Sequence, residues 1–94
     1  MRRVVWTEPA ALDLRRIRRF IAKDNPYAAE RIVALLQKAG DGLAEYPERG
    51  APVRGILRKL TTVKPYLLLY QVQEQEIHIM HIRHAARRPP RRAP

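Results

Sequence analysis

The chain has 94 residues, 46% of them hydrophobic and none of them cysteine. This length and composition predict one small domain with a single core, and they exclude disulfide bonds and thiolate metal sites. The net charge of +10 favours a polyanionic partner, such as nucleic acid, a nucleoprotein or an acidic protein. The sequence contains no signal-peptide core and no apolar run of membrane-spanning length. A cytoplasmic protein without a membrane partner is therefore expected.

The N-terminal residues predict a strand followed by a helix. Residues 2–6 include β-prone side chains, and Thr7 and Pro9 are typical of a helix start, as cap and first-turn residue. Apolar residues then recur at helical spacing as far as about residue 22: Ala10, Leu14, Ile17 and Ile21. This spacing predicts an amphipathic helix with its arginines on the outer face.

A second helix is expected to begin after Asn25, which is a suitable cap in front of Pro26. Its apolar stripe includes Ala28, Ile32, Leu35, Leu36, Ala39, Leu43 and Tyr46, which predicts a helix continuous to about residue 46. Gly40 and Gly42 are weak points within it, because each glycine costs about 1 kcal/mol relative to alanine. Together the two helices form a helical hairpin.

The C-terminal half predicts a three-stranded meander. Residues 47–55 have the composition of a loop, and residues 57–63 form the next strand. Residues 67–72 are nearly all apolar without alternation, which predicts a central strand covered on both faces. Residues 76–84 form the last strand, whose apolar phase changes near Met80. Either both of its faces are partly covered or a bulge lies there. The arginine- and proline-rich end is expected to be extended or disordered, giving a domain of residues 1–86 and a flexible basic tail of residues 87–94.

The expected fold class is therefore α+β. A short N-terminal strand and the C-terminal meander form a small antiparallel sheet, which packs on the helical hairpin.

Few residues carry recognisable catalytic chemistry. The sequence lacks a phosphate-binding glycine loop and a Ser/His/Asp arrangement, and its carboxylates lie mainly in the helices. His78, His81 and His84 recur at every third residue, which on a strand points neighbours to opposite faces. They are not expected to converge on a metal ion, and neither a metal nor a cofactor is predicted.

The remaining candidates are cationic and lie beside the central strand: Arg54, Arg58, Lys59, Arg83, His84 and Arg87. If their strands flank the central one, they line a basic cleft for target binding, with Tyr66 or Tyr70 available for base stacking. Arg58, Lys59, Arg83 and His84 would also suit in-line RNA cleavage, in which cations stabilise the phosphorane-like charge and a histidine moves protons. Each arginine alone is more typical of a solvated edge charge that prevents aggregation than of a functional site.

The order and spacing of several short motifs resemble the RelE/ParE family of bacterial toxins from type II toxin–antitoxin pairs. The motifs span residues 4 to about 88: residues 4–10, 13–14, 17–21, 25–29, 46–50 and 66–70, and the closing residues 84–87. The resemblance implies a small sheet packed on a helical hairpin. It also implies a cognate acidic antitoxin that wraps the toxin and neutralises it.

The family divides by target. ParE-like members inhibit DNA gyrase, whereas RelE-like and YoeB-like members cleave mRNA on the ribosome. Those nucleases often have an arginine where this chain has Leu67 and often end near a tyrosine, but no aromatic residue follows Tyr70. Both departures favour the ParE-like branch. The gyrase-type last strand commonly reads Arg-x-x-His, whereas here residues 81–84 place the arginine at position 83. A ribosome-dependent mRNA endonuclease and a non-catalytic basic binding module remain open alternatives.

Overall fold

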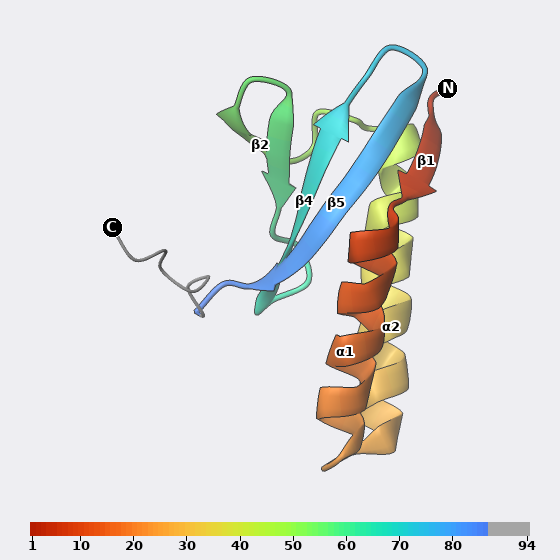
Figure 1. Ribbon diagram of the computed structural model, residues 1–94, viewed down its shortest axis with the longest axis vertical. Helices are drawn as coiled ribbons and strands as arrows, with labels where there is room; N and C mark the ends of the chain where they lie inside the picture. Colours follow the sequence, from red (N-terminus) through yellow and green to blue (C-terminus); the bar gives the residue numbers. More distant parts are fainter. Residues whose placement is uncertain (87–94) are drawn as a thin grey trace.

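The computed structural model describes residues 1–86, and the predicted tail of residues 87–94 lies outside the described residues. Two long helices lie side by side next to β1 and β5, as Figure 1 shows. The elements in chain order are β1 (Arg3–Trp6), α1 (Glu8–Ala22), α2 (Pro26–Asp41), the 3-10 turn η1 (Gly42–Ala44), β2 (Ala51–Arg54), β3 (Leu57–Leu60), β4 (Tyr66–Val72) and β5 (Glu76–His84). The predicted α+β class and the helical hairpin are confirmed.

Both helices begin where the sequence predicts. The Thr7 hydroxyl accepts a hydrogen bond from the Ala10 amide, and the Asn25 side chain accepts one from the Ala28 amide at 3.0 Å. The end of the second helix differs from the prediction. α2 stops at Asp41 and continues as η1 instead of reaching residue 46, because Gly42 occupies the C-cap, where glycine disfavours further α-helix.

The sheet has five strands in the order β1-β5-β4-β3-β2, which places β4 at its centre as predicted. Three features differ from the predicted sheet. β1 pairs parallel to β5, so the sheet is mixed, and residues 51–54 of the predicted loop form β2. Proline is tolerated in β2 because an edge strand has one side free of ladder hydrogen bonds. β3 also ends at Leu60 instead of residue 63.

Of the two alternatives for the last strand, the structure has the bulge. Tyr70 pairs with Ile79 and Leu69 pairs with His81, so that Met80 is the additional residue of β5. The bulge brings Ile77, Ile79 and Ile82 to one face of the sheet despite their irregular spacing.

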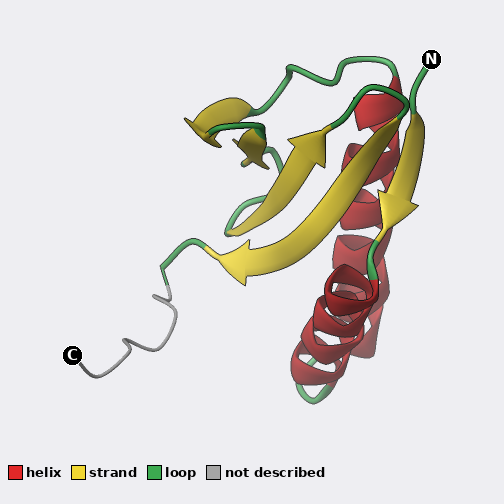
Figure 2. Ribbon diagram, turned by 45° about the horizontal axis from the view of Figure 1, so that its top comes forward, coloured by secondary structure: helices red, strands yellow, loops and turns green. Residues whose placement is uncertain are grey.

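The two faces of the sheet have different surroundings. In Figure 2 both helices lie on the same side of the sheet. The helix-covered face carries the core: Leu60, Tyr66, Leu68, Tyr70, Ile77, Ile79 and Ile82 pack with Ala10, Leu36 and Leu43. The opposite face, called the open face below, carries Lys59, Leu67, Leu69, Gln71, His78, His81 and Arg83 by strand register. The prediction that β4 is covered on both faces is therefore wrong, since Leu67 and Leu69 are only half-buried.

Candidate target-binding surface

The predicted basic cleft is divided between the two faces of the sheet. Lys59 and Arg83 lie on the open face, opposite Leu69 and Leu67 of β4. Arg58 pairs with Tyr70, and His84 pairs with Tyr66; both therefore belong to the helix-covered face. Arg54 is exposed on the edge strand β2, and Arg87 lies outside the described residues.

Arg58 is held by its own chain. Its Nη1 donates to the carbonyl oxygen of Gly50 at 2.6 Å and, more weakly, to that of Glu48 at 3.4 Å. Its Nη2 lies 3.7 Å from the Glu48 carboxylate, and the side chain is only 23% exposed. A guanidinium with these partners braces the loop before β2 and has few donors left for a target.

Tyr70 supports the same loop from inside. Its hydroxyl donates to the Pro47 carbonyl at 2.8 Å and accepts from the Gly50 amide at 2.9 Å. Burial raises the pKa of this hydroxyl above its ordinary value, although the Gly50 hydrogen bond and the Arg58 charge lower it. A fully buried phenol cannot stack on a nucleobase, so Tyr70 has a structural role.

His84 is packed at the end of the core. Its ring meets the Tyr66 ring edge to face, with centroids 5.5 Å apart, and its Nδ1 accepts from the Ala86 amide at 3.2 Å. Arg83 next to it is exposed on the open face. Of the predicted residues in β3 and β5, Lys59 and Arg83 are thus the two that are available to a partner.

An unpredicted carboxylate–imidazole pair joins α1 to β5. One Asp13 oxygen lies 3.0 Å from His81 Nδ1 and also accepts from the Ile82 amide at 3.0 Å. In the Nδ1–H tautomer His81 donates to Asp13, which leaves the Nε2 lone pair unused by that contact. The side chain of Asp13 is 16% exposed and that of His81 is 37% exposed. No local sequence signal connects two residues 68 positions apart.

The bulge also changes the arrangement of the histidines. It places His78 and His81 on the same face of β5, contrary to the predicted alternation, while His84 lies on the other. Among residues 1–86, no group of three or more histidine and acidic side chains is arranged to hold a metal ion.

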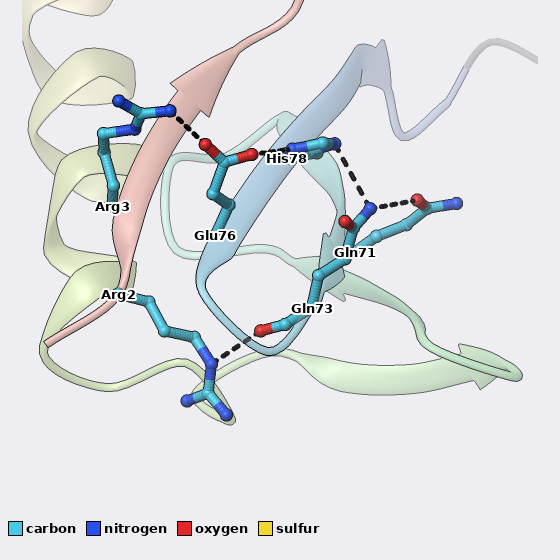
Figure 3. Close-up of polar contacts among 6 residues, drawn as sticks. All are labelled: Arg2, Arg3, Gln71, Gln73, Glu76 and His78. Atoms are coloured by element: carbon cyan, nitrogen blue, oxygen red, sulfur yellow. Dashed lines mark hydrogen bonds and ion pairs between the residues drawn. The ribbon is translucent and has the colours of Figure 1, made fainter.

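A polar network lies at the other end of the open face (Figure 3). Glu76 binds both Arg3 of β1 and Nε2 of His78, whose Nδ1 lies 3.2 Å from the Gln73 amide nitrogen. The His78 and Arg3 contacts lower the pKa of Glu76. Arg2 adds a 2.7 Å hydrogen bond to the Gln73 carbonyl. The network fastens β1 to β5 and to the turn before it.

The chain is thus a small basic α+β domain, with a helical hairpin on one face of its sheet and cations and half-buried leucines on the other. The family model described as the ParE toxin of the type II toxin–antitoxin system, parDE, matches residues 4–89. The chain belongs to this family and is a toxin of the RelE/ParE type, which confirms the resemblance found in the sequence.

Two related toxins match over most of their length. The chain is 48% identical over 87 residues to toxin RelE2 of Caulobacter vibrioides, covering 93% of this chain and 99% of the relative. It is 38% identical over 86 residues to putative toxin Y4kP of Sinorhizobium fredii, covering 89% of this chain and 88% of the relative.

The fold is similar to a solved chain from the chromosomal ParDE toxin–antitoxin system of P. aeruginosa. The TM-score is 0.77 at 26% identity, with 89% of this chain and 96% of the other covered. In residues 1–86 no helix has both the length and the apolar character needed to cross a bilayer.

Proposed function

We propose that this toxin arrests growth by binding DNA gyrase without catalysing a reaction, and that a cognate acidic antitoxin neutralises it. The observation that best supports this proposal is that the cationic side chains needed for RNA cleavage lie on different faces of the sheet. Arg58 is bound to backbone carbonyls and lies on the helix-covered face, as does His84, while Lys59 and Arg83 lie on the open face. A phosphoryl-transfer site requires such groups to converge within hydrogen-bonding reach of one phosphate.

The open face is the proposed target-binding surface. Leu67 and Leu69 offer half-buried apolar area there, and Lys59 and Arg83 flank it with positive charge. An apolar centre with a charged rim is the usual anatomy of a protein–protein interface. Arg54, exposed on β2, is proposed to extend this cationic surface, and Arg87, which lies outside the described residues, is proposed to contribute to target binding as well.

The test measures both activities for the same toxin, one with purified protein and one in cells. Gyrase supercoiling of relaxed plasmid is assayed over a toxin titration, and primer extension on mRNA is run after expression of the toxin in cells. We expect loss of supercoiling without new toxin-dependent mRNA 5′ ends. New 5′ ends together with unimpaired supercoiling would contradict the proposal.

A second candidate function, ribosome-dependent mRNA cleavage, is favoured by the Asp13–His81 pair. A carboxylate that orients a partly exposed imidazole is a suitable arrangement for a general base. If this candidate is correct, His81→Ala abolishes new 5′ ends, and His81→Gln does not restore them although its amide can donate to Asp13. If the toxin instead acts by binding gyrase, His81→Ala and His81→Gln are expected to inhibit supercoiling to the same extent as each other.

The role of the antitoxin is tested by expressing the toxin alone and together with the antitoxin. Expression of the toxin is expected to arrest growth, and co-expression of the antitoxin encoded beside its gene is expected to restore it. Normal growth at a high level of folded, soluble toxin would contradict this part of the proposal.

A further inference from the structure

The bulge at Met80 decides which side chains of β5 reach the open face. Ile77 and Ile79 before it lie on the helix-covered face, and so does Ile82 after it. Residues of a regular strand alternate between faces, so uninterrupted pairing after Ile79 would turn Ile82 to the open face and Arg83 into the core. With the bulge, Ile82 is buried and Arg83 is exposed on the open face. The availability of Arg83 to a target therefore depends on this irregularity.

The first strand does not support β5 beyond the bulge. The parallel pairing of β1 with β5 ends at Trp6 and Ile79, where the chain passes into α1 (Figure 1). Within residues 1–86, no strand pairs with that side of β5 after Ile79. The backbone N–H and C=O groups on this side therefore need partners other than a strand.

Two side chains, from the cap and the second turn of α1, bond to β5 on either side of the bulge. The Thr7 hydroxyl donates to the Ile79 carbonyl at 2.6 Å, before the bulge. Asp13 Oδ2 accepts from the Ile82 amide at 3.0 Å, after the bulge, and the same oxygen lies 3.0 Å from His81 Nδ1. A hydrogen bond to a carboxylate is stronger than one between neutral groups, so Asp13 is the firmer of the two attachments.

We propose that Asp13 is a positioning residue of the toxin, which fixes the bulge of β5 and thereby holds Arg83 on the open face for target binding. Asp13 acts through its bond to the Ile82 amide, which sets the path of the backbone one residue before Arg83. The imidazole of His81 is not required for this role. The inference rests on the proposed function, because it assigns a purpose to the position of Arg83.

The first experiment measures the local structure without any target. The chain has no cysteine, so Ile82→Cys and Arg83→Cys each introduce a single reactive thiol. Without further changes, the thiol at position 82 should react with a maleimide much more slowly than the thiol at position 83, because Ile82 is 5% exposed and Arg83 is exposed. Asp13→Ala should accelerate the reaction at position 82 by at least about tenfold, because the end of β5 then opens more often.

Three controls separate the backbone bond from charge and from the imidazole. Asp13→Asn keeps an oxygen that can accept from the Ile82 amide, and His81→Ala keeps the Asp13 carboxylate. Asp24→Ala removes a carboxylate from an exposed position between the two helices. All three should leave the reaction at position 82 unchanged. Circular dichroism verifies folding; if Asp13→Ala does not fold, Asp13→Ser replaces it, because its hydroxyl lies closer to the α1 backbone than the carboxylate oxygens do.

The second experiment tests whether Asp13 acts through Arg83. Gyrase affinity is measured for Asp13→Ala, Arg83→Ala and their combination, and the same cycle is repeated with Lys59→Ala in place of Arg83→Ala. Asp13→Ala alone should weaken binding by about tenfold, and it should weaken it little further when Arg83→Ala is already present. Its effect should multiply with that of Lys59→Ala, because Lys59 lies on β3 and does not depend on the bulge. A general loss of stability would instead multiply with both.

An unchanged reaction at position 82 in Asp13→Ala would overturn the inference, as would an Asp13→Ala effect on affinity that multiplies equally in both cycles. Full gyrase affinity of Asp13→Ala, with a parent toxin that binds gyrase, would overturn it as well. A parent toxin that does not bind gyrase would overturn the proposed function. The thiol reactions need no target, so the two failures are distinguishable.

Discussion

At the scale of single residues, two glycines of similar sequence context have opposite environments. A Cβ on Gly40 would overlap Trp6 and lie 2.7 Å from Cδ1 of Ile79, whereas a Cβ on Gly42 would meet nothing within 4 Å. Gly42 also has ordinary helical torsion angles, φ −66° and ψ −15°. The same chemical change is therefore expected to have opposite effects at the two sites.

Gly40→Ala should destabilise the domain by about 1–3 kcal/mol, because the added methyl group overpacks a fixed indole. Gly42→Ala should be neutral or stabilising by up to about 1 kcal/mol, because it restricts the unfolded chain without strain. Urea denaturation of the two variants and the parent measures both values. A destabilisation of similar size in both variants would show that the Trp6 contact is not the cause.

Glu76 predicts a pH dependence of stability. The contacts with His78 and Arg3 lower the pKa of Glu76 in the folded state. Its contribution to folding stability is therefore present above the unfolded-state pKa and is lost as the pH falls through the folded-state pKa. Glu76→Gln should therefore be less stable than the parent at pH 7. The difference should disappear in acid, once the parent carboxylate is protonated. Denaturant midpoints for the two proteins at several pH values measure this, and a difference that does not shrink as the pH falls would contradict the charge-based explanation.

At the scale of elements, β4 shows how a continuous apolar run can still have two different faces. Leu68 is buried against the helices, and its neighbour Leu69 is half-buried on the open face. Adjacent residues of a strand point to opposite faces, so the two leucines differ in burial although they are identical in sequence context.

Leu68→Asp should therefore cost about 3 kcal/mol or more, because it places a charge in the core without a partner. Leu69→Asp should cost about 1 kcal/mol, close to the unfavourable β propensity of aspartate. Thermal melting of both variants provides the measurement. Equal melting temperatures for the two would mean that the faces of β4 are assigned incorrectly.

At the scale of the whole molecule, the +10 charge is spread over more than one surface. Lys59 and Arg83 lie on the open face, whereas Arg15 and Arg18 are exposed on α1. Only the charges of the open face belong to the proposed target-binding surface, so toxicity is expected to respond to substitutions there and not to equal changes on α1.

The double variant Lys59→Glu and Arg83→Glu should lose growth arrest at matched soluble expression, because repulsion replaces the attraction proposed for the target. Its melting temperature should change little, since exposed charges contribute little to stability. The control, Arg19→Glu with Lys23→Glu, changes the net charge equally at exposed positions near the end of α1 and should remain toxic. If the control is equally inactive, net charge alone explains the effect.

The sequence by itself determined the features that depend on near neighbours. The helix starts follow from Thr7 and Asn25, whose caps bond three residues ahead. The change of apolar phase near Met80 marked the irregular point of the last strand, although it left a bulge and partial cover of both faces as alternatives. The order of elements and the family motifs are likewise readable along the chain, which is why the α+β class and the RelE/ParE assignment were predictable.

Only the tertiary structure decided which distant residues meet. Three contacts join segments about 35 to 75 positions apart: the parallel pairing of β1 with β5, the Asp13–His81 contact and the packing of Trp6 against Gly40. Strand register likewise places Lys59 on the open face, whereas its neighbour Arg58 lies on the helix-covered face and holds the loop before β2. Such pairings depend on how whole elements pack, because a side chain's partner is set by register and burial and not by the residues beside it in sequence.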